Sequence, residues 1–492
     1  MNEKYPIIGI DLGTTNSCIG TFNTETKKIE IIPMTESSNL YPSIIDFPNE
    51  KIKVSNVKRF IGKSELTDQL QRESLFIEYE VLQSNQKLTL SVGKDKKKFY
   101  SPEELSSIVL KEMKKRAEKY LKKKIKDIIV TVPAHFNDAQ RKLTVTACTI
   151  AEMNVIGIIN EPTAAALAYT IIHENLYYNK KKILVFDLGG GTLDISVLET
   201  NGKEYFNVLN TIGDTSLGGE DFTNEILIWW IEKFATEYSL QDEDLNNILS
   251  NKVLVNSIKK KIEEAKKELS SKDFSIIEYS IENMVLKQKI TNEDVSIICN
   301  DLLNKCRSLL KNLMDICECE KSEIEDVILV GGATRMIQIK NLMKSFFNKD
   351  PKCDINPDEA IAYGATVYSA IMNGYGKYIN NISVNDVTPM AIGIKTKGGK
   401  IVSIIRKNTK IPCKESKIFK TVTNSQTTAL LQIYQGDDEK EMHKLGECRL
   451  NDIIGNTSIQ VTIYVDTSNV ITLTAINLSS GKMIEFAQSA LN

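Results

Sequence analysis

The sequence contains few residues that bind metals through nitrogen or sulfur. Its 492 residues include three histidines, His135, His173 and His443, which lie far apart, and nine cysteines that form no CxxC pair. An odd number of scattered cysteines favours neither a zinc site nor a disulfide framework. The chemistry of this protein is therefore expected to depend on carboxylates, lysines and backbone groups.

The sequence also lacks a surplus of one charge and a long apolar run. Its 62 Lys and Arg and 64 Asp and Glu residues give a net charge of -2, which provides no basic excess for sequence-independent binding of nucleic acid. No apolar run approaches the ~18 residues of a membrane span. The apolar start at 7–10 is interrupted by Asp11 and has no basic lead or cleavage site. We therefore expect a cytoplasmic protein with no nucleic-acid partner and no membrane partner.

A pattern that occurs twice is the most informative feature present. The segments PIIGIDLGTTNSCIGTF (6–22) and KILVFDLGGGTLDISVL (182–198) each consist of a β-branched run, an Asp at its end, a turn rich in Gly and Thr, and a second alternating strand. Each copy predicts a β-hairpin whose turn leaves backbone N–H groups accessible. The repetition predicts two related α/β lobes in the first two-thirds of the chain.

Strand and helix patterns alternate between and after the two copies, which is typical of an α/β sheet core. We expect strands within 127–133 and 326–335, and helices over 102–123, from 160, over 252–269 and over 292–317. The segment INPDEAIAYGATVYSAI predicts a further helix, with Asn356 at its N-cap, Pro357 at its first position and Glu359 closing a capping box.

The pattern changes beyond about residue 375, where short alternating strands and turn residues continue to the end of the sequence. This stretch predicts a separate antiparallel β domain. The expected organisation is an α/β unit at 1–381, a linker at 382–386 and a β domain at 387–492.

Two Gly/Thr turns, each preceded by an Asp, provide what a nucleoside triphosphate and its metal require. Backbone N–H groups of a tight turn form an anion-binding nest, and glycines let the backbone approach the phosphates closely. Asp11 and Asp187 are expected to face Mg²⁺ largely through water, and Thr14, Thr15 and Thr192 to donate hydroxyl groups. One copy is equally typical of a plain hairpin turn, and the second copy favours the phosphate site. The glycines lead into a strand and no GxxxxGK[ST] occurs, so the pattern is neither a Rossmann fingerprint nor a Walker loop.

Further residues could complete such a site. Glu161 begins a helix, where it could cap the helix, order the waters of a metal or orient an attacking water. Gly331 and Gly332 follow a buried strand and would let the backbone lie against adenine or ribose. The helix near 260 carries on one face a set that suits a grip on sugar and base, although such spacing alone is common on solvated helices: Glu263, Lys266 and Ser270.

Eight motifs together resemble those of the 70-kDa heat-shock protein chaperones. They are IGIDLGTTNSC, VTVPAHFNDAQR, INEPTAAALAY, DLGGGTLDIS, GDTSLGGEDF, DVILVGGATRM, NPDEAIAYGA and DVTPMAIGI. They follow the order of that family and cover nearly the whole chain. The resemblance implies an α/β fold in which an actin-like ATPase domain of two duplicated lobes precedes a short linker and a C-terminal antiparallel β-sandwich that holds extended hydrophobic peptides.

The resemblance also implies roles for individual residues. Catalysis would involve Lys58, Glu161, Asp187, Thr192 and Asp194, with Lys58 stabilising charge that develops on the γ-phosphoryl group. ATP or ADP with Mg²⁺ would be bound by Asp11, Gly13, Thr14, Thr15, Gly189, Gly190, Gly191, Thr192, Gly218, Gly219, Glu220, Glu263, Lys266, Ser270, Gly331, Gly332, Arg335 and Asp358. The relay of nucleotide state would use Pro133, Arg141 and Asp386. The peptide pocket would consist of Ile394, Phe419, Val422, Ala429, Leu431 and Ile433.

The chain also departs from the pattern of that family. The segment before Lys58 is shorter, and the linker contains polar residues where the family has leucines, so weaker coupling between the domains is expected. Gly157 stands where the family carries an arginine that meets J-domain partners, and Lys397 replaces an apolar residue over the peptide site. The sequence ends about where a helical lid would begin, so fast peptide exchange and low affinity are expected.

The function expected from these features is that of an ATP-dependent molecular chaperone. It would couple ATP hydrolysis to binding and release of unfolded or extended hydrophobic segments in protein folding and the stress response, with a J-domain co-chaperone and a nucleotide exchange factor as partners. The alternative is a lidless regulatory co-chaperone, associated with the ribosome or another chaperone, that binds ATP but not clients. A sugar kinase or filament-forming ATPase on the same fold is disfavoured because neither accounts for the C-terminal β domain.

Overall fold

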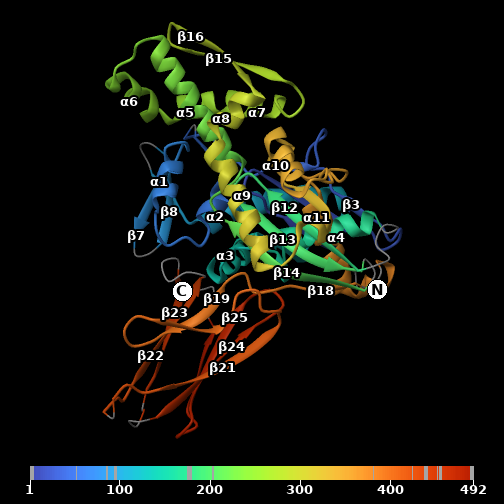
Figure 1. Ribbon diagram of the computed structural model, residues 1–492, viewed down its shortest axis with the longest axis vertical. Coiled ribbons are helices and arrows are strands. Elements are labelled where there is room, and N and C mark those ends of the chain that lie inside the picture. The colour runs from blue at the N-terminus through green and yellow to red at the C-terminus, as the bar shows by residue number, and fades with distance from the viewer. Residues whose placement is uncertain are drawn as a thin grey trace.

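The chain folds into two α/β lobes and a β-sandwich that lies below them in Figure 1. The computed structural model describes residues 5–487 except 51, 85–86, 94–96, 174–179, 202–203, 380–381, 424, 437–441, 452 and 454–456. Within this part of the chain, no helix combines the length and the apolar character needed to cross a bilayer.

Lobe I is built on a six-stranded sheet with the order β11-β10-β1-β2-β3, in which β4 also pairs with β2. Its strands are β1 (Ile7–Asp11), β2 (Asn16–Phe22), β3 (Ile29–Ile31), β4 (Leu40–Pro42), β10 (Asp127–Val132) and β11 (Asn154–Asn160). Around it lie β5 (Ile45–Phe47), β6 (Ile52–Val54), η1 (Val57–Phe60), α1 (Asp68–Ser74), β7 (Glu80–Ser84), β8 (Lys87–Val92), β9 (Lys98–Tyr100), α2 (Pro102–Leu121) and α3 (Asp138–Ile150). Helix α2 begins at a capping box of Ser101 and Glu104, as expected from a helix starting at 102.

Lobe II repeats this plan with the sheet order β17-β12-β13-β14-β18. Its strands are β12 (Lys181–Leu188), β13 (Leu193–Thr200), β14 (Tyr205–Asp214), β17 (Ile324–Val330) and β18 (Ser383–Asn385). The other elements are α5 (Gly219–Glu237), α6 (Asp242–Ser250), α7 (Lys252–Glu268), β15 (Phe274–Ile281), β16 (Met284–Thr291), α8 (Asn292–Ile298), α9 (Asn300–Ile316), η3 (Lys321–Glu323), η4 (Gly332–Arg335) and α10 (Ile337–Phe347). The single helix expected over 292–317 is divided into α8 and α9 at Cys299.

The two sequence copies form equivalent hairpins, which confirms the prediction of two related lobes. β1 pairs antiparallel with β2 and parallel with β10, just as β12 pairs antiparallel with β13 and parallel with β17. The Asp of each copy ends the first strand, with Asp11 opposite Cys18 and Asp187 opposite Asp194. Each hairpin turn is therefore held at an equivalent edge of its own sheet.

Two apolar helices, α4 (Glu161–Ile172) and α11 (Ala360–Ala370), pack against each other between the sheets (Figure 1). Residues of both helices are buried together with Ile129 of lobe I and Val185 of lobe II. A methyl group at Gly364 would overlap the carbonyl oxygen of Ala164, because the backbones of the helices nearly touch there. This contact holds the two lobes at a fixed separation.

Replacement of Gly364 by Val tests that close contact. We expect Gly364→Val to lower the free energy of unfolding by about 3 kcal/mol or more, because backbone rather than a movable side chain occupies the space. Chemical denaturation would measure the loss. The control is Gly157→Ala, since the added methyl would meet only the flexible end of Ile129; equal losses in the two variants would contradict the explanation.

The C-terminal part is an antiparallel β-sandwich of two four-stranded sheets, which confirms the expected fold class. One sheet has the order β20-β19-β22-β23 and the other β21-β24-β25-β26. The strands are β19 (Ala391–Lys395), β20 (Ile401–Ile405), β21 (Cys413–Lys420), β22 (Ala429–Gly436), β23 (His443–Leu450), β24 (Ser458–Val465), β25 (Ile471–Asn477) and β26 (Met483–Ala487). Alternate residues of these strands, such as Val461 and Ile463, fill a shared apolar core.

The sandwich contacts both lobes. In lobe I, Asp138 at the start of α3 donates its backbone N–H to Gln435 (3.0 Å) and accepts the N–H of Ile471 through its carboxylate (3.1 Å). In lobe II, the backbone N–H of Thr211 donates to the side chain of Asn408 (3.3 Å). The end of the sandwich that meets the lobes is therefore anchored by hydrogen bonds from buried or half-buried groups.

The linker segment forms an edge strand on lobe II. Ser383–Asn385 is β18 and pairs in parallel with β14. Ile382 is buried and Val384 half-buried, whereas Ser383 and Asn385 face solvent. The expectation that the polar residues remove apolar burial is wrong in this conformation, because they occupy the outward positions of an alternating strand.

The expected start of the last helix is also wrong. Helix α11 begins at Ala360 with Glu359 at its N-cap, three residues later than the capping-box pattern indicated. The side chain of Asn356 accepts the N–H of Asp358 (3.2 Å) and a guanidinium N–H of Arg335 (3.1 Å). Glu359 accepts a bond from Asn39 of lobe I (3.0 Å), so it does not close a capping box. These contacts make residues 356–359 a turn that lines the cleft.

Candidate functional site

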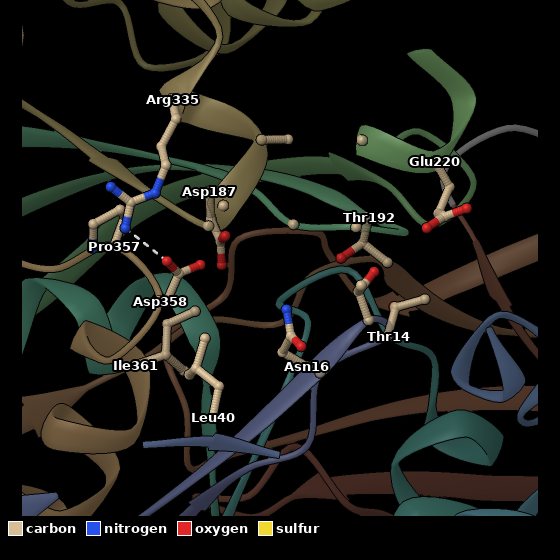
Figure 2. Close-up of a pocket in the computed structure, with 18 of the residues that line it drawn as sticks. Thr14, Asn16, Leu40, Asp187, Thr192, Glu220, Arg335, Pro357, Asp358 and Ile361 are labelled. Atoms are coloured by element: carbon tan, nitrogen blue, oxygen red, sulfur yellow. Dashed lines mark hydrogen bonds and ion pairs between the residues drawn. The ribbon is translucent and has the colours of Figure 1, made fainter. Parts of the chain in front are cut away.

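The two hairpin turns face each other across a cavity of about 560 Å³ between the lobes (Figure 2). This volume lies within the usual range of small-molecule sites. Asp11, Thr14 and Thr15 enter from lobe I, and Asp187 and Thr192 from lobe II. A methyl group at Gly190 would overlap the hydroxyl of Thr15, so the opposing turns approach as closely as their backbones permit.

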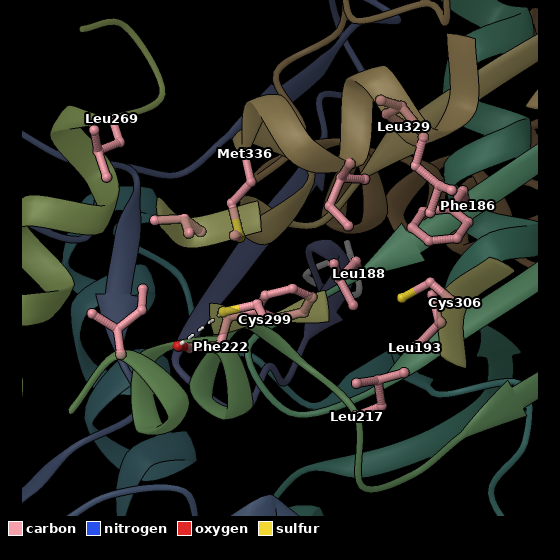
Figure 3. Close-up of a cluster of buried hydrophobic side chains, with 14 of the residues drawn as sticks. Phe186, Leu188, Leu193, Leu217, Phe222, Leu269, Cys299, Cys306, Leu329 and Met336 are labelled. Atoms are coloured by element: carbon pink, nitrogen blue, oxygen red, sulfur yellow. Dashed lines mark hydrogen bonds between the residues drawn. The ribbon is translucent and has the colours of Figure 1, made fainter. Parts of the chain in front are cut away.

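The turn of lobe II is supported by the N-terminus of helix α5. The N–H groups of Gly219 and Glu220 donate to the carbonyls of Gly189 and Gly190, both at 2.9 Å. The start of α5 in turn packs on a buried apolar layer that includes Leu217 and Phe222 (Figure 3). These bonds fix the turn against the helix, and the glycines of the turn would let its backbone approach a bound anion closely.

The same apolar layer accounts for two of the cysteines. Cys299 and Cys306 lie beside Phe222, Leu193 and Leu217 in the lobe II core (Figure 3). Burial raises the pKa of both thiols to about 12. They therefore remain protonated and act as small apolar packing groups.

Carboxylates crowd around one buried lysine at the bottom of the cavity. Lys58 on η1 forms an ion pair with Glu161 at the start of α4, with Nζ and Oε1 2.6 Å apart. Burial and the charge of Glu161 raise the pKa of Asp11 to about 7, and the same two causes raise the pKa of Asp194 to about 7. The pKa of Asp187 is raised well above its ordinary value by burial and by Glu161. The cluster therefore contains more carboxyl groups than Lys58 alone can keep ionised.

Several polar atoms in this cluster have unmet bonding capacity. Asp11 accepts a hydrogen bond from Thr131 (3.1 Å), and Asp194 accepts one from the backbone N–H of His135 (3.0 Å). Among the described residues, Asp187 Oδ2, Asp194 Oδ2 and Thr15 Oγ1 are buried without a hydrogen-bond partner. Buried groups of this kind require a ligand, a metal or water. Hard carboxylate oxygens beside Gly-rich anion sites fit hydrated Mg²⁺ and phosphates.

The outer part of the cavity is lined by residues of lobe II. Lys266 donates to the carbonyl of Gly219 and to Thr223, both at 2.7 Å, and pairs with Glu263 at 2.7 Å. Arg335 pairs with Asp358 at 2.6 Å (Figure 2). Gly331 has a φ of 81°, which favours glycine, and it lets the backbone turn away from β17 into η4.

The structure brings most of the expected nucleotide residues to this one cavity. All of them line it except Gly191 and Gly218. A methyl group at Gly218 would lie 2.5 Å from the N of Gly191. These two glycines therefore let the turn before α5 pack closely against the hairpin turn of lobe II, just outside the cavity wall. Of the expected catalytic residues, Lys58, Glu161, Asp187 and Thr192 line the cavity, and Asp194 lies behind it, paired in register with Asp187.

Some lining residues were not expected from the sequence. They are Asn16, Leu40, Lys267, Met336, Pro357 and Ile361, four of which are labelled in Figure 2. Pro357 and Ile361 could have been found from their proximity in sequence to Asp358. Leu40 carries no sequence signal because only the pairing of β4 with β2 brings it to the cleft.

A buried ion triad beside the site was also missed. Arg59 contacts Glu73 of lobe I (3.0 Å) and Asp221 on the first turn of α5 in lobe II. Burial opposes the charge of Arg59, but Glu73 and Asp221 outweigh burial and raise the pKa of the guanidinium. Arg59 directly follows Lys58, so one short 3-10 helix provides a side chain to the carboxylate cluster and another that joins the lobes. The only hint of this triad in the sequence was that two basic residues, Lys58 and Arg59, are adjacent.

Two of the three expected relay residues, Pro133 and Arg141, lie between the cavity and the linker, and the third, Asp386, is in the linker. Arg141 donates from Nε to the carbonyl of Phe136 (3.0 Å), and from one terminal nitrogen to the carbonyl of Ala134 (2.9 Å) and to Asn160 (2.8 Å). Pro133 begins the turn that contains these carbonyls. Asn160 and Thr163 each donate to Asp386 of the linker at 2.9 Å.

The expected peptide-pocket residues lie in the sandwich, far from the cavity (Figure 1). Ile394, Ala429, Leu431 and Ile433 are buried in its apolar core, and Phe419 packs against them. Val422 is 51% exposed, on the loop that joins β21 to β22. The structure thus groups five of the six and places the sixth at the surface.

The fold and the cleft together define a class: a protein with an actin-like fold of two duplicated lobes around a cleft lined by two Gly-rich turns, joined to a β-sandwich. Comparison with known proteins identifies the family within this class. A family model described as Hsp70 protein matches residues 7–490, and the chain belongs to the Hsp70 family. This membership supports a chaperone function.

Curated relatives match over almost the whole chain. The chain is 36% identical to Heat shock 70 kDa protein 2 of Paracoccidioides lutzii, an alignment that covers 97% of this chain and 76% of that protein. It is 35% identical to Heat shock cognate 70 kDa protein 3 of Dictyostelium discoideum, with 97% and 79% covered.

Proposed function

We propose that this protein is an ATP-hydrolysing chaperone that couples the nucleotide cycle to binding and release of extended apolar polypeptide segments. The observation that carries the proposal is the buried pair of Lys58 and Glu161 among three carboxylates, between two Gly-rich turns. This arrangement leaves more carboxyl groups than one lysine can keep ionised, and it leaves unpaired oxygens, where a metal and phosphates would be held. The proposed domains are 1–381, the linker 382–386 and 387–492.

The residues of the cleft divide the work of such a reaction. The turns around Thr14 and Gly190 would bind the phosphates through backbone N–H groups. Bound Mg²⁺, held through water by Asp11 and Asp187, would neutralise phosphate charge. Lys58 would stabilise charge that develops on the γ-phosphoryl group, and Asp194 would orient the attacking water. Glu161 holds the Lys58 ammonium in position through its ion pair at 2.6 Å.

A continuous set of contacts connects this chemistry to the sandwich. Asp194 accepts the N–H of His135, and the adjacent Ala134 carbonyl accepts from Arg141. Arg141 donates to Asn160, which donates to Asp386 of the linker. A change in the charge around Asp194 would therefore reach the linker through directly bonded groups. Unfolded clients, a J-domain co-chaperone and a nucleotide exchange factor are the partners that this function requires.

Single-turnover ATP hydrolysis, with and without an apolar peptide and a J-domain protein, tests the proposal. We expect hydrolysis that both partners stimulate. Hydrolysis that is indifferent to both would favour the alternative function of a regulatory co-chaperone that does not bind clients. Absence of ATP binding would refute the assignment of the cleft.

Asp187 provides a prediction with opposite effects on stability and ligand binding. We expect Asp187→Asn to leave the ligand-free protein as stable as the original chain or more stable, because it removes one of several like charges in a buried cluster. The same change should remove most of the thermal stabilisation that Mg²⁺ adds to ATP binding. Thermal melts with ATP, in the presence of Mg²⁺ or of a chelator, would measure both effects.

The control for this prediction is Asp46→Asn, which removes an exposed carboxylate of lobe I. It should leave both melting temperatures and the Mg²⁺ effect unchanged. A full Mg²⁺-dependent stabilisation in Asp187→Asn would show that Asp187 does not face the metal.

A further inference from the structure

The end of the sandwich that lies away from the lobes carries a set of loops, which we call the distal end. Contacts with the lobes involve Gln435 at the end of β22 and Ile471 at the start of β25. Because all strands of the sandwich are antiparallel, the loops 396–400 and 421–428 both lie at the opposite end (Figure 1). These loops follow β19 and β21, the strands that carry Ile394 and Phe419.

Apolar side chains are exposed at the distal end beside the apolar core. Val422 in loop 421–428 is 51% exposed, and Leu430 just after that loop is 46% exposed. Phe419 is half-buried and packs against the core cluster that contains Ile394 and Leu431. Exposed apolar groups next to a half-buried aromatic ring favour contact with an apolar segment of another chain.

The charged residues of these two loops are lysines, and neither loop contains Asp or Glu. The sandwich as a whole, residues 387–492, contains 13 Lys and Arg and nine Asp and Glu residues, for a net charge of +4, although the whole chain has a net charge of -2. Lys397 and Lys400 lie in loop 396–400, and Lys420 precedes loop 421–428; all three are exposed. An ion pair among the described residues of the sandwich joins Lys444 and Glu447 and involves none of these three lysines.

The backbone of loop 396–400 holds its two lysines in a defined place. The N–H of Thr396 donates to the carbonyl of Lys400 at 2.8 Å, and the hydroxyl of Thr396 donates to the same carbonyl at 2.8 Å. Lys420 is paired in register with Ser458 at the end of β21. Lys397 and Lys400 therefore lie in a loop closed by bonds between Thr396 and Lys400, and Lys420 ends a paired strand just before the second loop.

We propose that the client segments of this sandwich are apolar stretches flanked by Asp and Glu, with the acidic flanks contacting Lys397, Lys400 and Lys420. The inference rests on the proposed chaperone function and specifies its substrate class. Apolar contact would provide most of the affinity, and the lysines would select among apolar segments by the charge of their flanks. Each exposed contact is weak and screened by salt, so the selection is expected to be about 10-fold in total at low ionic strength.

Three labelled peptides with a common centre rich in Leu and Val test the inference on the full chain. Their flanks are acidic, serine or basic, and fluorescence anisotropy gives each Kd at low and at high salt. We expect the acidic-flanked peptide to bind about 10-fold more tightly than the basic-flanked one at low salt, with the serine-flanked peptide between them. The ratio should approach one at high salt.

Charge-reversal variants locate the effect. Lys397→Glu and Lys420→Glu should each reduce or invert the preference, measured as the ratio of the Kd values of the acidic-flanked and basic-flanked peptides. The matched control is Lys414→Glu, which reverses an exposed charge on β21, roughly 20 Å along the strand from Lys420. It should retain the preference.

The outcomes separate this inference from the function on which it rests. If no peptide binds, the proposed client binding fails. If the serine-flanked peptide binds but the three Kd values are equal, or if the basic flanks bind more tightly, client binding stands and the inference is overturned. The salt series on the unaltered chain distinguishes these outcomes even if a variant does not fold.

Discussion

Lys58→Ala is expected to lower the single-turnover rate of ATP hydrolysis by roughly 10³-fold, the order of effect of a cation that faces a transferring phosphoryl group. ATP should still bind, because the turns and the outer part of the cavity remain. Lys58 is buried and pairs only with Glu161 among the described acidic groups within ion-pair distance, at 2.6 Å. The ammonium group can therefore interact with a bound phosphate without first breaking an ion pair with a surface residue.

The same substitution leaves Glu161 buried beside Asp11, Asp187 and Asp194 without its cation. Breaking a buried pair in this way costs about 3–5 kcal/mol, so loss of turnover could reflect unfolding. The double variant Lys58→Ala/Glu161→Gln removes the unpaired charge and should regain stability without regaining turnover. Quench-flow kinetics with thermal melts would separate the two effects.

The control for Lys58 is Lys53→Ala, which removes an exposed lysine from β6 in the same segment. Its turnover should equal that of the original chain. A Lys58→Ala variant that hydrolyses ATP at the original rate would disprove the assignment of the cluster as the catalytic centre.

Arg141→Ala is expected to uncouple the sandwich from the cleft. Arg141 is fully buried, and its loss leaves three acceptors, on Phe136, Ala134 and Asn160, without their donor. Each unsatisfied buried group costs about 1–3 kcal/mol. Asn160 is also a donor to Asp386, so the linker should be held less tightly on lobe I, where the bond from Thr163 to Asp386 remains. We expect stimulation of ATP hydrolysis by an apolar peptide to be lost while basal hydrolysis persists.

Two measurements check this expectation. Limited proteolysis should cleave the 382–386 linker of Arg141→Ala faster than that of the original chain, and the ratio of peptide-stimulated to basal hydrolysis should fall toward one. Arg141→Lys keeps a charge but cannot reach all three acceptors, so it should be intermediate. The control is Arg307→Ala, which removes an exposed contact on α9. Full peptide stimulation in Arg141→Ala would contradict the role of this residue as a relay.

Much of the cleft could be predicted from the sequence because its signals are local. Asp11 and Asp187 end β-branched runs and precede turns of Gly and Thr. A β-hairpin places its turn residues at the edge of the sheet, and this does not depend on the rest of the fold. The repetition of the pattern indicated two lobes, and the structure forms the two hairpins with equivalent pairings.

Residues that act through distant contacts could not be predicted in this way. Leu40 lines the cavity only because β4 pairs with β2. Glu359 fits a capping box by sequence, yet it accepts a hydrogen bond from Asn39, a residue 320 positions away, and the helix begins later. A contact between lobes can outweigh a cap worth about 1 kcal/mol.

The polar linker shows the same limit. Ser383 and Asn385 suggested weak docking, but in the strand their exposed side chains donate to the carbonyl of Glu204 (3.0 Å) and to Asn207 (2.8 Å) of lobe II. Ile382 and Val384 occupy the inward positions. Sequence alone thus determined the family, the two lobes, the β-sandwich and the residue types of the cleft, because periodicity and turn chemistry are properties of short segments. Tertiary structure decided that Arg59 joins the two lobes, that the linker pairs with β14, and that lysines lie beside the exposed apolar groups of the sandwich. These features depend on which surfaces meet after folding.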